Sequence, residues 1–284
     1  MKLCSLSSGS SGNCVYIESD QSRILVDAGK SARQLQSLMS QAGLDPKRLD
    51  GIFVTHEHAD HVQGVGVLSR RFHLPIFASE GTWQAMSKKL GRVDHQNQRI
   101  IVKDQPFSFR DLQVHPIGIY HDAIDPLAYT FRCGTEKVSV LTDTGVVDER
   151  ILTAIRGSAI YYLEANHDVE MVLNGPYPPL LKDRILSARG HLSNHQAASI
   201  LVELVEGRGE VVLLAHLSAE NNTPELCDAT IRADLMEAGL DPDRHLQLLI
   251  APRHTPSPLF PCSRDIRKEA CVPMEPFSFS PSRV

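Results

Sequence analysis

The run H-x-H-x-D-H at residues 56–61 constrains this chain more than any other feature, because it places three imidazoles and one carboxylate within six positions. It directly follows an apolar stretch that predicts a buried strand. Side chains alternate along an extended segment, so His56 and His58 can point at one metal ion. Asp60 and His61 lie where the chain must turn away, and they can reach a second ion. The motif is more specific than a solvated polar loop and indicates a segment that serves two cations.

Length, charge and composition restrict the class of protein. A chain of 284 residues, 42% of them hydrophobic, is compatible with one layered α/β domain. No apolar run approaches the roughly 20 residues that span a bilayer, and the first residues lack the apolar core of a secretion signal, which predicts a cytoplasmic protein with no membrane partner. The formal net charge of −5 lacks the basic excess of a protein that coats nucleic acid, so a polyanion would have to be held locally by metal ions.

Polar side chains also end several apolar, strand-like stretches further along the chain. His121, Asp143 and His216 each follow such a stretch directly, and Glu164 ends another. Because strand ends of a layered sheet converge on one rim, we expect the first three to join the H-x-H-x-D-H run as metal ligands. Any one of them alone could be an ordinary hydrogen-bonded side chain at a strand end. The alternation of predicted strands and helices, including a helix at 62–72, favours an α/β layer architecture.

The order of these residues resembles the metallo-β-lactamase superfamily, in which an aspartate after the second strand, here Asp27, precedes H-x-H-x-D-H, a lone His, a lone Asp and a final His. The resemblance covers residues 1–258 and implies a four-layer αβ/βα sandwich of two mixed sheets flanked by helices, with a dinuclear site on one edge of the sheets. A proline-rich segment, 259–284, is expected to form a disordered tail. The implied ligands are His56, His58 and His121 for one ion and Asp60, His61 and His216 for the other, with Asp143 between the ions and Asp27 supporting the histidine loop.

Three further segments, at 9–13, 190–194 and 216–225, resemble the YycJ/WalJ/VicX branch of this superfamily, which is similar to nucleases and phosphodiesterases. In the related ribonuclease Z a histidine loop before the final strand contacts the scissile phosphate, and His191 lies at the similar place. This resemblance implies that His191 protonates the leaving oxygen or stabilises charge; the alternative is a loop histidine beside a helix cap. The branch's Asn-Tyr-Asp reads Asn-His-Asp here, and His167 is expected to be structural.

Together these residues predict a metal-dependent phosphodiesterase, in which two divalent ions (Zn or Mn, with Fe possible) share a bridging hydroxide as the nucleophile and Asp60 orients it. The leading interpretation is a 5′-to-3′ exonuclease acting on DNA, with RNA as a second possible substrate. The interval between His121 and Asp143 is too short for a tRNA-clamping arm. The alternatives are a small-molecule hydrolase for a cyclic phosphodiester, thioester or lactone, and a catalytically idle, metal-stabilised signalling module. The expected substrate contacts are Ser10, Ser11 and Asn13, in a loop that could equally be a tight turn, together with Ser193 and Asn194.

Overall fold

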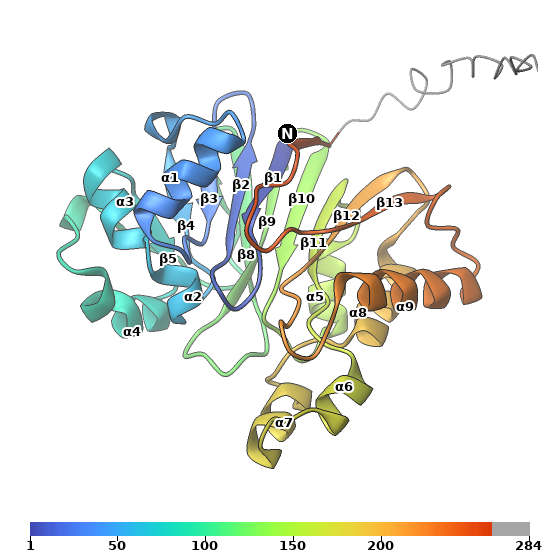
Figure 1. The fold of residues 1–284 in the computed structure, drawn as a ribbon. Helices are drawn as coiled ribbons and strands as arrows, with labels where there is room; N and C mark the ends of the chain where they lie inside the picture. Colours follow the sequence, from blue (N-terminus) through green and yellow to red (C-terminus); the bar gives the residue numbers. More distant parts are fainter. Residues whose placement is uncertain (263–284) are drawn as a thin grey trace, which may run out of the picture.

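The computed structural model describes residues 1–262, and their strands form two seven-stranded sheets that pack face to face (Figure 1). The first sheet has the order β14-β1-β2-β3-β4-β5-β6, with strands Phe260–Pro261, Lys2–Ser7, Cys14–Glu18, Arg23–Val26, Gly51–Phe53, Ile76–Ala78 and Gln98–Ile100. The second has the order β13-β12-β11-β10-β9-β8-β7, with strands Leu246–Ile250, Glu210–Ala215, Ile160–Glu164, Glu136–Leu141, Leu127–Cys133, Leu112–Gly118 and Phe107–Phe109.

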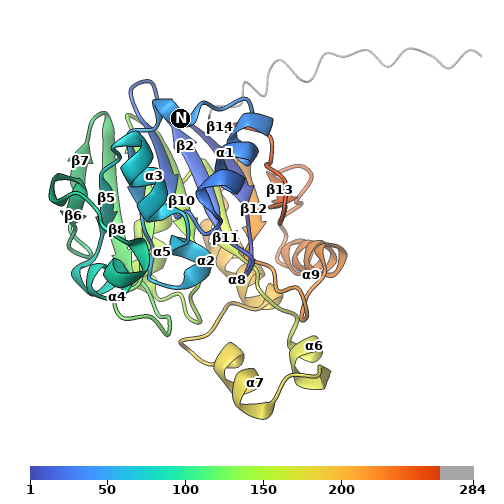
Figure 2. The same cartoon turned by 60° about the vertical axis from the view of Figure 1, so that its left-hand side comes forward.

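Both sheets are mixed. The strands from β14 to β3 are antiparallel and those from β3 to β6 are parallel, whereas β7 to β10 are antiparallel and β10 to β13 are parallel. Helices on the outer face of the first sheet are α1 Ala32–Gln41, α2 Ala59–Val62, α3 Val65–Phe72 and α4 Glu80–Leu90. Those on the outer face of the second sheet are α5 Glu149–Ile155, α8 Asn194–Leu204 and α9 Pro224–Glu237. Between β11 and α8, the helices α6 Val169–Asn174 and α7 Pro179–Leu186 stand apart from both sheets (Figure 2).

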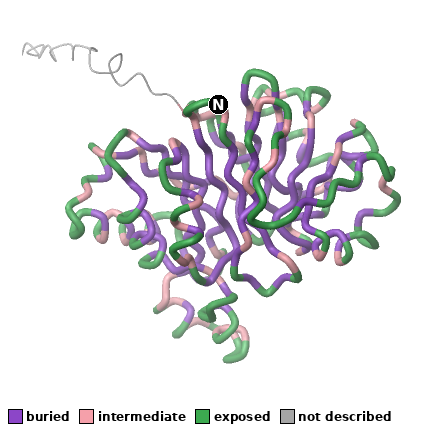
Figure 3. The backbone as a smooth tube through the Cα atoms, turned by 180° about the vertical axis from the view of Figure 1, so that it is seen from behind, coloured by how far each residue is buried: buried purple, intermediate pink, exposed green. Residues whose placement is uncertain are grey.

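Apolar side chains fill three layers, one between the sheets and one under each set of helices. The central strands are accordingly buried along most of their length (Figure 3). In the layer between the sheets, Phe53 packs edge-on against Tyr129 and Phe131 with ring centroids 5.8 and 5.3 Å apart. Phe53 ends β4, so this packing fixes the strand that leads into the histidine motif. The arrangement confirms the α/β class and the four-layer αβ/βα sandwich.

The structure departs from the sequence-based expectations in some elements. The expected helix at 62–72 is interrupted before α3, where a Cβ on Gly64 would meet the Lys30 carbonyl oxygen at 2.4 Å. Strand β1 was not expected, and β14 pairs with it inside the segment assigned to the tail, so the described fold continues four residues past 258. The rest of the expected tail, 263–284, lies outside the described residues. Among the helices that the structure describes, none is both long and apolar enough to cross a bilayer.

Candidate metal centre

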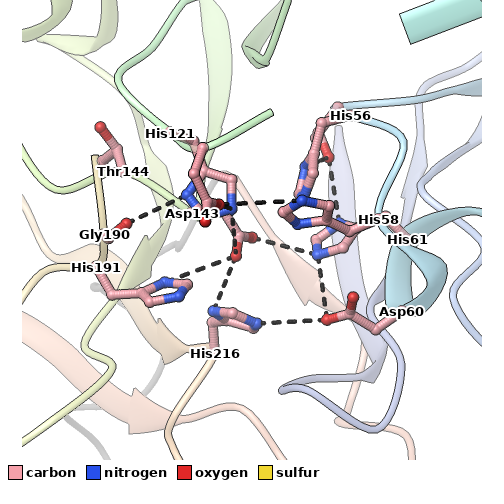
Figure 4. A network of polar contacts seen from close by, with 12 residues as sticks. His56, His58, Asp60, His61, His121, Asp143, Thr144, Gly190, His191 and His216 are labelled. Carbon is pink, nitrogen blue, oxygen red and sulfur yellow. Dashed lines mark hydrogen bonds and ion pairs between the residues drawn. The ribbon is translucent and has the colours of Figure 1, made fainter. Parts of the chain in front are cut away.

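The expected ligands meet at one edge of the sandwich, although they come from both sheets (Figure 4). His56 and His58 lie on the loop after β4, and Asp60 and His61 belong to the short helix α2. The others follow strands of the second sheet, with His121 after β8, Asp143 after β10 and His216 after β12. Because β10, β11 and β12 are parallel neighbours, their carboxyl ends deliver side chains to the same rim.

Possible metal-binding atoms form overlapping groups whose members all lie within 4.8 Å of one another. One group contains His56, His58 and His121, and another contains Asp60, His61 and His216. Asp143 shares one group with His56 and His61, and a further group with Glu164, His191 and His216. The structure therefore brings together both triads that the sequence suggested, and it places Asp143 where it can reach each of them.

The backbone takes an uncommon conformation where three of these side chains leave their strands. Asp27, Asp143 and His216 have φ angles of 61°, 58° and 55°, in the left-handed region. For a residue with a Cβ this conformation costs on the order of 1 kcal/mol, and it occurs often at functional sites because it re-aims a side chain sharply. Close packing accompanies it, since a Cβ on Gly29 would lie only 1.6 Å from the Asp60 carbonyl oxygen. The fold thus tolerates strain in order to direct these groups into the centre.

Four of the candidate ligand histidines are held through Nδ1. Such contacts fix the orientation of an imidazole and leave Nε2 as its ligand atom. The contacts are His56 Nδ1 to Thr55 Oγ1 at 3.0 Å, His61 Nδ1 to Asp27 Oδ2 at 2.7 Å, His121 Nδ1 to the Gly190 carbonyl oxygen at 3.2 Å and His216 Nδ1 to Glu164 Oε1 at 3.0 Å. Asp27 also accepts hydrogen bonds from the amide and hydroxyl of Thr55. It lies behind the histidine loop, the position that the sequence predicts for it.

Several buried atoms that face the centre have no hydrogen-bond partner among the described residues. They include His56 Nε2, His216 Nε2 and Asp143 Oδ2. An unpaired buried polar atom costs about 1–3 kcal/mol, so unpaired atoms gathered in one place call for a common partner. Two nitrogen acceptors and a carboxylate oxygen suit a divalent transition metal. The residues present therefore fit a metal centre.

The two triads contain histidines whose pKa values are shifted in opposite directions. Burial lowers the pKa of His56, and the neighbouring imidazoles of His61, His121 and His58 lower it further, so His56 is neutral and ready to bind a cation. Burial alone would lower the pKa of His216 as well, but Asp143, Asp60 and Glu164 raise it to about 10. A metal bound by His216 must therefore displace a proton, and affinity at that triad should rise with pH.

Glu164 is a central residue that sequence reasoning did not place in the site. Its side chain is fully buried, and Oε1 accepts hydrogen bonds from Nδ1 of His191 at 2.8 Å and of His216 at 3.0 Å. Oε2 accepts from the amides of Thr144 and Leu192. Burial would raise the pKa of Glu164, but the hydrogen bonds and charges of His191 and His216 lower it, so the group is an anion. One carboxylate thus orients both a candidate ligand and the candidate catalytic histidine.

His191 lies beside the centre and is partly open to solvent. Its Nδ1 is 3.7 Å from Asp143 Oδ1, and the side chain is 19% exposed. Ser193 and Asn194, which were expected to contact substrate, are buried instead: Ser193 forms a capping box with Gln196 at the start of α8, and Asn194 bonds to Asn222. We therefore assign these two residues to positioning the His191 loop. His167 is buried as well, as expected for a structural residue.

The small-residue loop at 9–13 borders two cavities beside the centre, since Ser10 lines both. A cavity of about 450 Å³ is bordered by Ser10, Ser11, Asp60 and Lys89, and one of about 210 Å³ by Ser10, His191 and His216 together with α7. Ser10 and Ser11 are exposed, as a substrate contact requires. Asn13 is buried, and its amide nitrogen lies 3.0 Å from His61 Nε2 and 3.3 Å from Asp60 Oδ2. Asn13 thus ties this loop to the candidate ligands.

Comparison with known sequences gives two kinds of match. Residues 22–217 match the family described as "Beta-lactamase superfamily domain". The exodeoxyribonuclease WalJ of Streptococcus pneumoniae serotype 2 is 42% identical over 237 residues, which cover 83% of this chain and 88% of that protein. The exodeoxyribonuclease YycJ of Bacillus anthracis is 40% identical over 234 residues, which cover 82% of this chain and 89% of that protein.

Solved structures show the same fold at low sequence identity. The metallo-β-lactamase fold protein YhfI from Bacillus subtilis superposes with a TM-score of 0.67 and 15% identity, over 90% of this chain and 98% of that one. Zn²⁺-bound PqqB from Methylobacterium extorquens gives a TM-score of 0.68 and 14% identity, over 90% and 99% of the two chains.

Proposed function

Because this chain belongs to the metallo-β-lactamase superfamily, and within it to the branch of the WalJ and YycJ exodeoxyribonucleases, we propose that it is a metal-dependent exonuclease that degrades DNA from the 5′ end. The observation that carries the proposal is the set of buried His and Asp atoms that face one another without hydrogen-bond partners at the sheet edge. A metal centre that activates water keeps one position open for it, whereas a purely structural zinc site closes four protein ligands around the metal.

Seven residues would hold the metal ions. His56, His58 and His121 would hold one ion and Asp60, His61 and His216 the other, and Asp143 is grouped with members of both triads. When bound, two divalent ions would activate a water and neutralise charge on a phosphate oxygen. Their four positive charges exceed those of the two carboxylates in the set, so the centre would favour an anionic phosphodiester over a neutral ester. Zinc and manganese both suit this mixture of imidazole and carboxylate.

The residues around the ligands have separate tasks. Asp60 borders the larger cavity with a quarter of its side chain exposed, so its carboxylate can accept a hydrogen bond from the attacking water and orient it. As water adds to phosphorus, the bond from phosphorus to O3′ of the terminal nucleotide breaks. Glu164 accepts from His191 Nδ1, which leaves Nε2 to deliver a proton to the departing O3′. The products are a free nucleotide and a strand that carries a new 5′-phosphate.

The exposed loop beside Asp60 suits the phosphates of the substrate. Ser10 and Ser11 border the cavities, and Lys30 Nζ donates to the Ser11 carbonyl oxygen at 3.2 Å. Lys89 lines the larger cavity, where its ammonium group can pair with a phosphate oxygen. We assign these side chains to binding the DNA end rather than to the chemical step.

The test is a comparison of substrates with metal-loaded protein. Duplex DNA labelled at the 5′ end should release labelled mononucleotides early, whereas DNA labelled at the 3′ end should release its label late. The alternative substrates are RNA of the same sequence, the small diester bis(4-nitrophenyl) phosphate, a cyclic phosphodiester, a thioester and a lactone. Asp143→Ala controls for a contaminating nuclease. If thioesters, lactones or cyclic phosphates turn over and DNA does not, the exonuclease proposal is wrong and a small-molecule hydrolase replaces it.

A further inference from the structure

The helices α6 and α7, with the turns around them, form an arm over residues 168–190 that stands away from both sheets beside the metal centre (Figures 1 and 2). Its first end is fixed to the body, and its second end is joined to the His191 loop. The amide of Asp168 donates to the Asn221 carbonyl oxygen at 2.8 Å, and the amide of His191 donates to that of Ile185 at 3.1 Å. A Cβ on Gly190 would meet the Ile185 carbonyl oxygen at 2.2 Å, so α7 packs directly against the His191 loop.

A second attachment links α7 to the metal ligands. Arg184 pairs with Asp122 Oδ2, and the other oxygen of Asp122 lies 3.3 Å from His121 Nε2 and 3.9 Å from His58 Nε2. The guanidinium offsets the charge of a carboxylate that would otherwise repel a phosphate near the centre. The position of the arm is therefore tied to the histidines of one triad.

Residues of the arm line the 210 Å³ cavity together with His191 and His216. Leu181, Arg184 and Ile185 share one face of α7 by their i, i+3, i+4 spacing, and Tyr177, which precedes the helix, also lines the cavity. Neither Tyr177 nor Leu181 joins any of the apolar core clusters found within residues 1–262. Their apolar surfaces thus face the cavity instead of a core.

The shape and chemistry of this cavity suit one base. It is smaller than the roughly 300–1,000 Å³ of sites that enclose drug-sized ligands, so it fits part of a nucleotide and excludes a duplex. An aromatic ring and a leucine offer apolar surface to the face of a base, which every nucleobase presents. His191 also lines the cavity, and the proposed function places it beside the bond to the departing O3′. The base within reach of Tyr177 therefore belongs to the nucleotide being released.

We propose that the arm is a nucleobase subsite, in which Tyr177 and Leu181 contact the base of the 5′-terminal nucleotide and hold its O3′ beside His191. This inference rests on the proposed exonuclease activity and adds to it. Binding in this subsite requires that the terminal nucleotide is unpaired before cleavage, because a base in the cavity cannot also remain in the duplex. Terminal bases that are mismatched or unpaired should be removed faster, since less pairing energy is lost.

The test combines a protein change with a substrate change. Tyr177→Ala, Tyr177→Phe and Leu180→Ala would be assayed on two DNA ends, one normal and one with an abasic analogue at the 5′-terminal position. Leu180 is the matched control, because it lies on the same helix, is 84% exposed and does not line the cavity. Metal content and melting temperature would be measured for each variant, so that loss of folding or of metal is recognised.

Loss of base stacking lowers binding roughly 5- to 150-fold per base. The kcat/KM of wild type should fall by about this factor on the abasic end, and the kcat/KM of Tyr177→Ala should fall by the same factor on the normal end. For Tyr177→Ala on the abasic end, the fall should be no larger than either of these. Tyr177→Phe and Leu180→Ala should behave as wild type. If Tyr177→Ala keeps the full preference for the normal end, or loses activity equally on both ends, the subsite is wrong while the exonuclease stands. If metal-loaded wild type cleaves neither end, the proposed function itself fails.

Discussion

Replacing Glu164 with glutamine tests whether a single buried carboxylate organises the centre. In the native protein all four of its hydrogen bonds are accepted, two from histidine Nδ1 atoms and two from backbone amides. A glutamine side chain has one oxygen and one NH₂ group, so its NH₂ group must face either the two histidines or the two backbone amides. If it faces the amides, donor meets donor; if it faces the histidines, His216 can accept only by moving its proton to Nε2, which removes a metal ligand.

The expected size of the effect follows from these contacts. A group that orients a metal-bound histidine contributes 10- to 100-fold in metal affinity, and an unsatisfied buried group costs about 1–3 kcal/mol of stability. Glu164→Gln should therefore bind metal about 10- to 100-fold more weakly, as measured by competition with a chelator, and should lower the free energy of unfolding of the metal-free protein by about 2 kcal/mol.

Glu210→Gln is the matched control. Glu210 is also buried and accepts two backbone amides, from Glu206 and Arg208, but it lies at the start of β12, whereas the site follows the end of that strand. This variant should lose stability and keep its metal affinity. If Glu164→Gln loses stability alone, with metal affinity and DNA cleavage like those of Glu210→Gln, then Glu164 is only a structural acid and our assignment is refuted.

Three further predictions follow from the same geometry. Asp143→Ala should reduce a metal content of two ions per chain to one or none by elemental analysis, and unchanged content would contradict its place between the triads. His191→Ala should keep both metals and lose about 10²- to 10⁴-fold in kcat, because it removes a proton donor and no ligand; near-normal turnover would return His191 to a loop role. His167→Tyr should remove part of the acid sensitivity. Burial lowers the pKa of His167 to about 4, so below pH about 6.5 the unfolded chain binds a proton that the folded chain does not, and stability falls by up to about 3 kcal/mol between pH 6.5 and 4. The free energy of unfolding should depend less on pH in the variant across this range. An identical pH dependence in the two proteins would show that His167 does not cause the acid sensitivity.

Candidate ligands could be identified from sequence because each lies at a signal that sequence carries, the end of an apolar strand. The structure brings His121, Asp143 and His216 within reach of the histidine run, since parallel strands end on one rim. Glu164 carries the same signal, and β11 lies beside β10 in register, with Leu163 opposite Leu141. The sequence does not show whether a side chain at a strand end faces the centre or lies behind the ligands. Asp143 faces the centre and Glu164 lies behind the histidines, a difference of orientation that strand spacing does not encode.

The arm was not predicted for a different physical reason. A helix that covers a core repeats its apolar residues with the helical period, because one face must be buried. The arm helices bury only Val172 and Ile185, and their other larger apolar residues point both outward, as Leu173 and Leu180 do, and toward the cavity, as Leu181 does. Their pattern is therefore irregular, and it looks like a loop in sequence. The same irregularity is what a substrate wall requires, because its apolar side chains must stay uncovered until a base arrives. We therefore expect the arm, whose apolar residues lack the helical period, to be the segment that selects the DNA end.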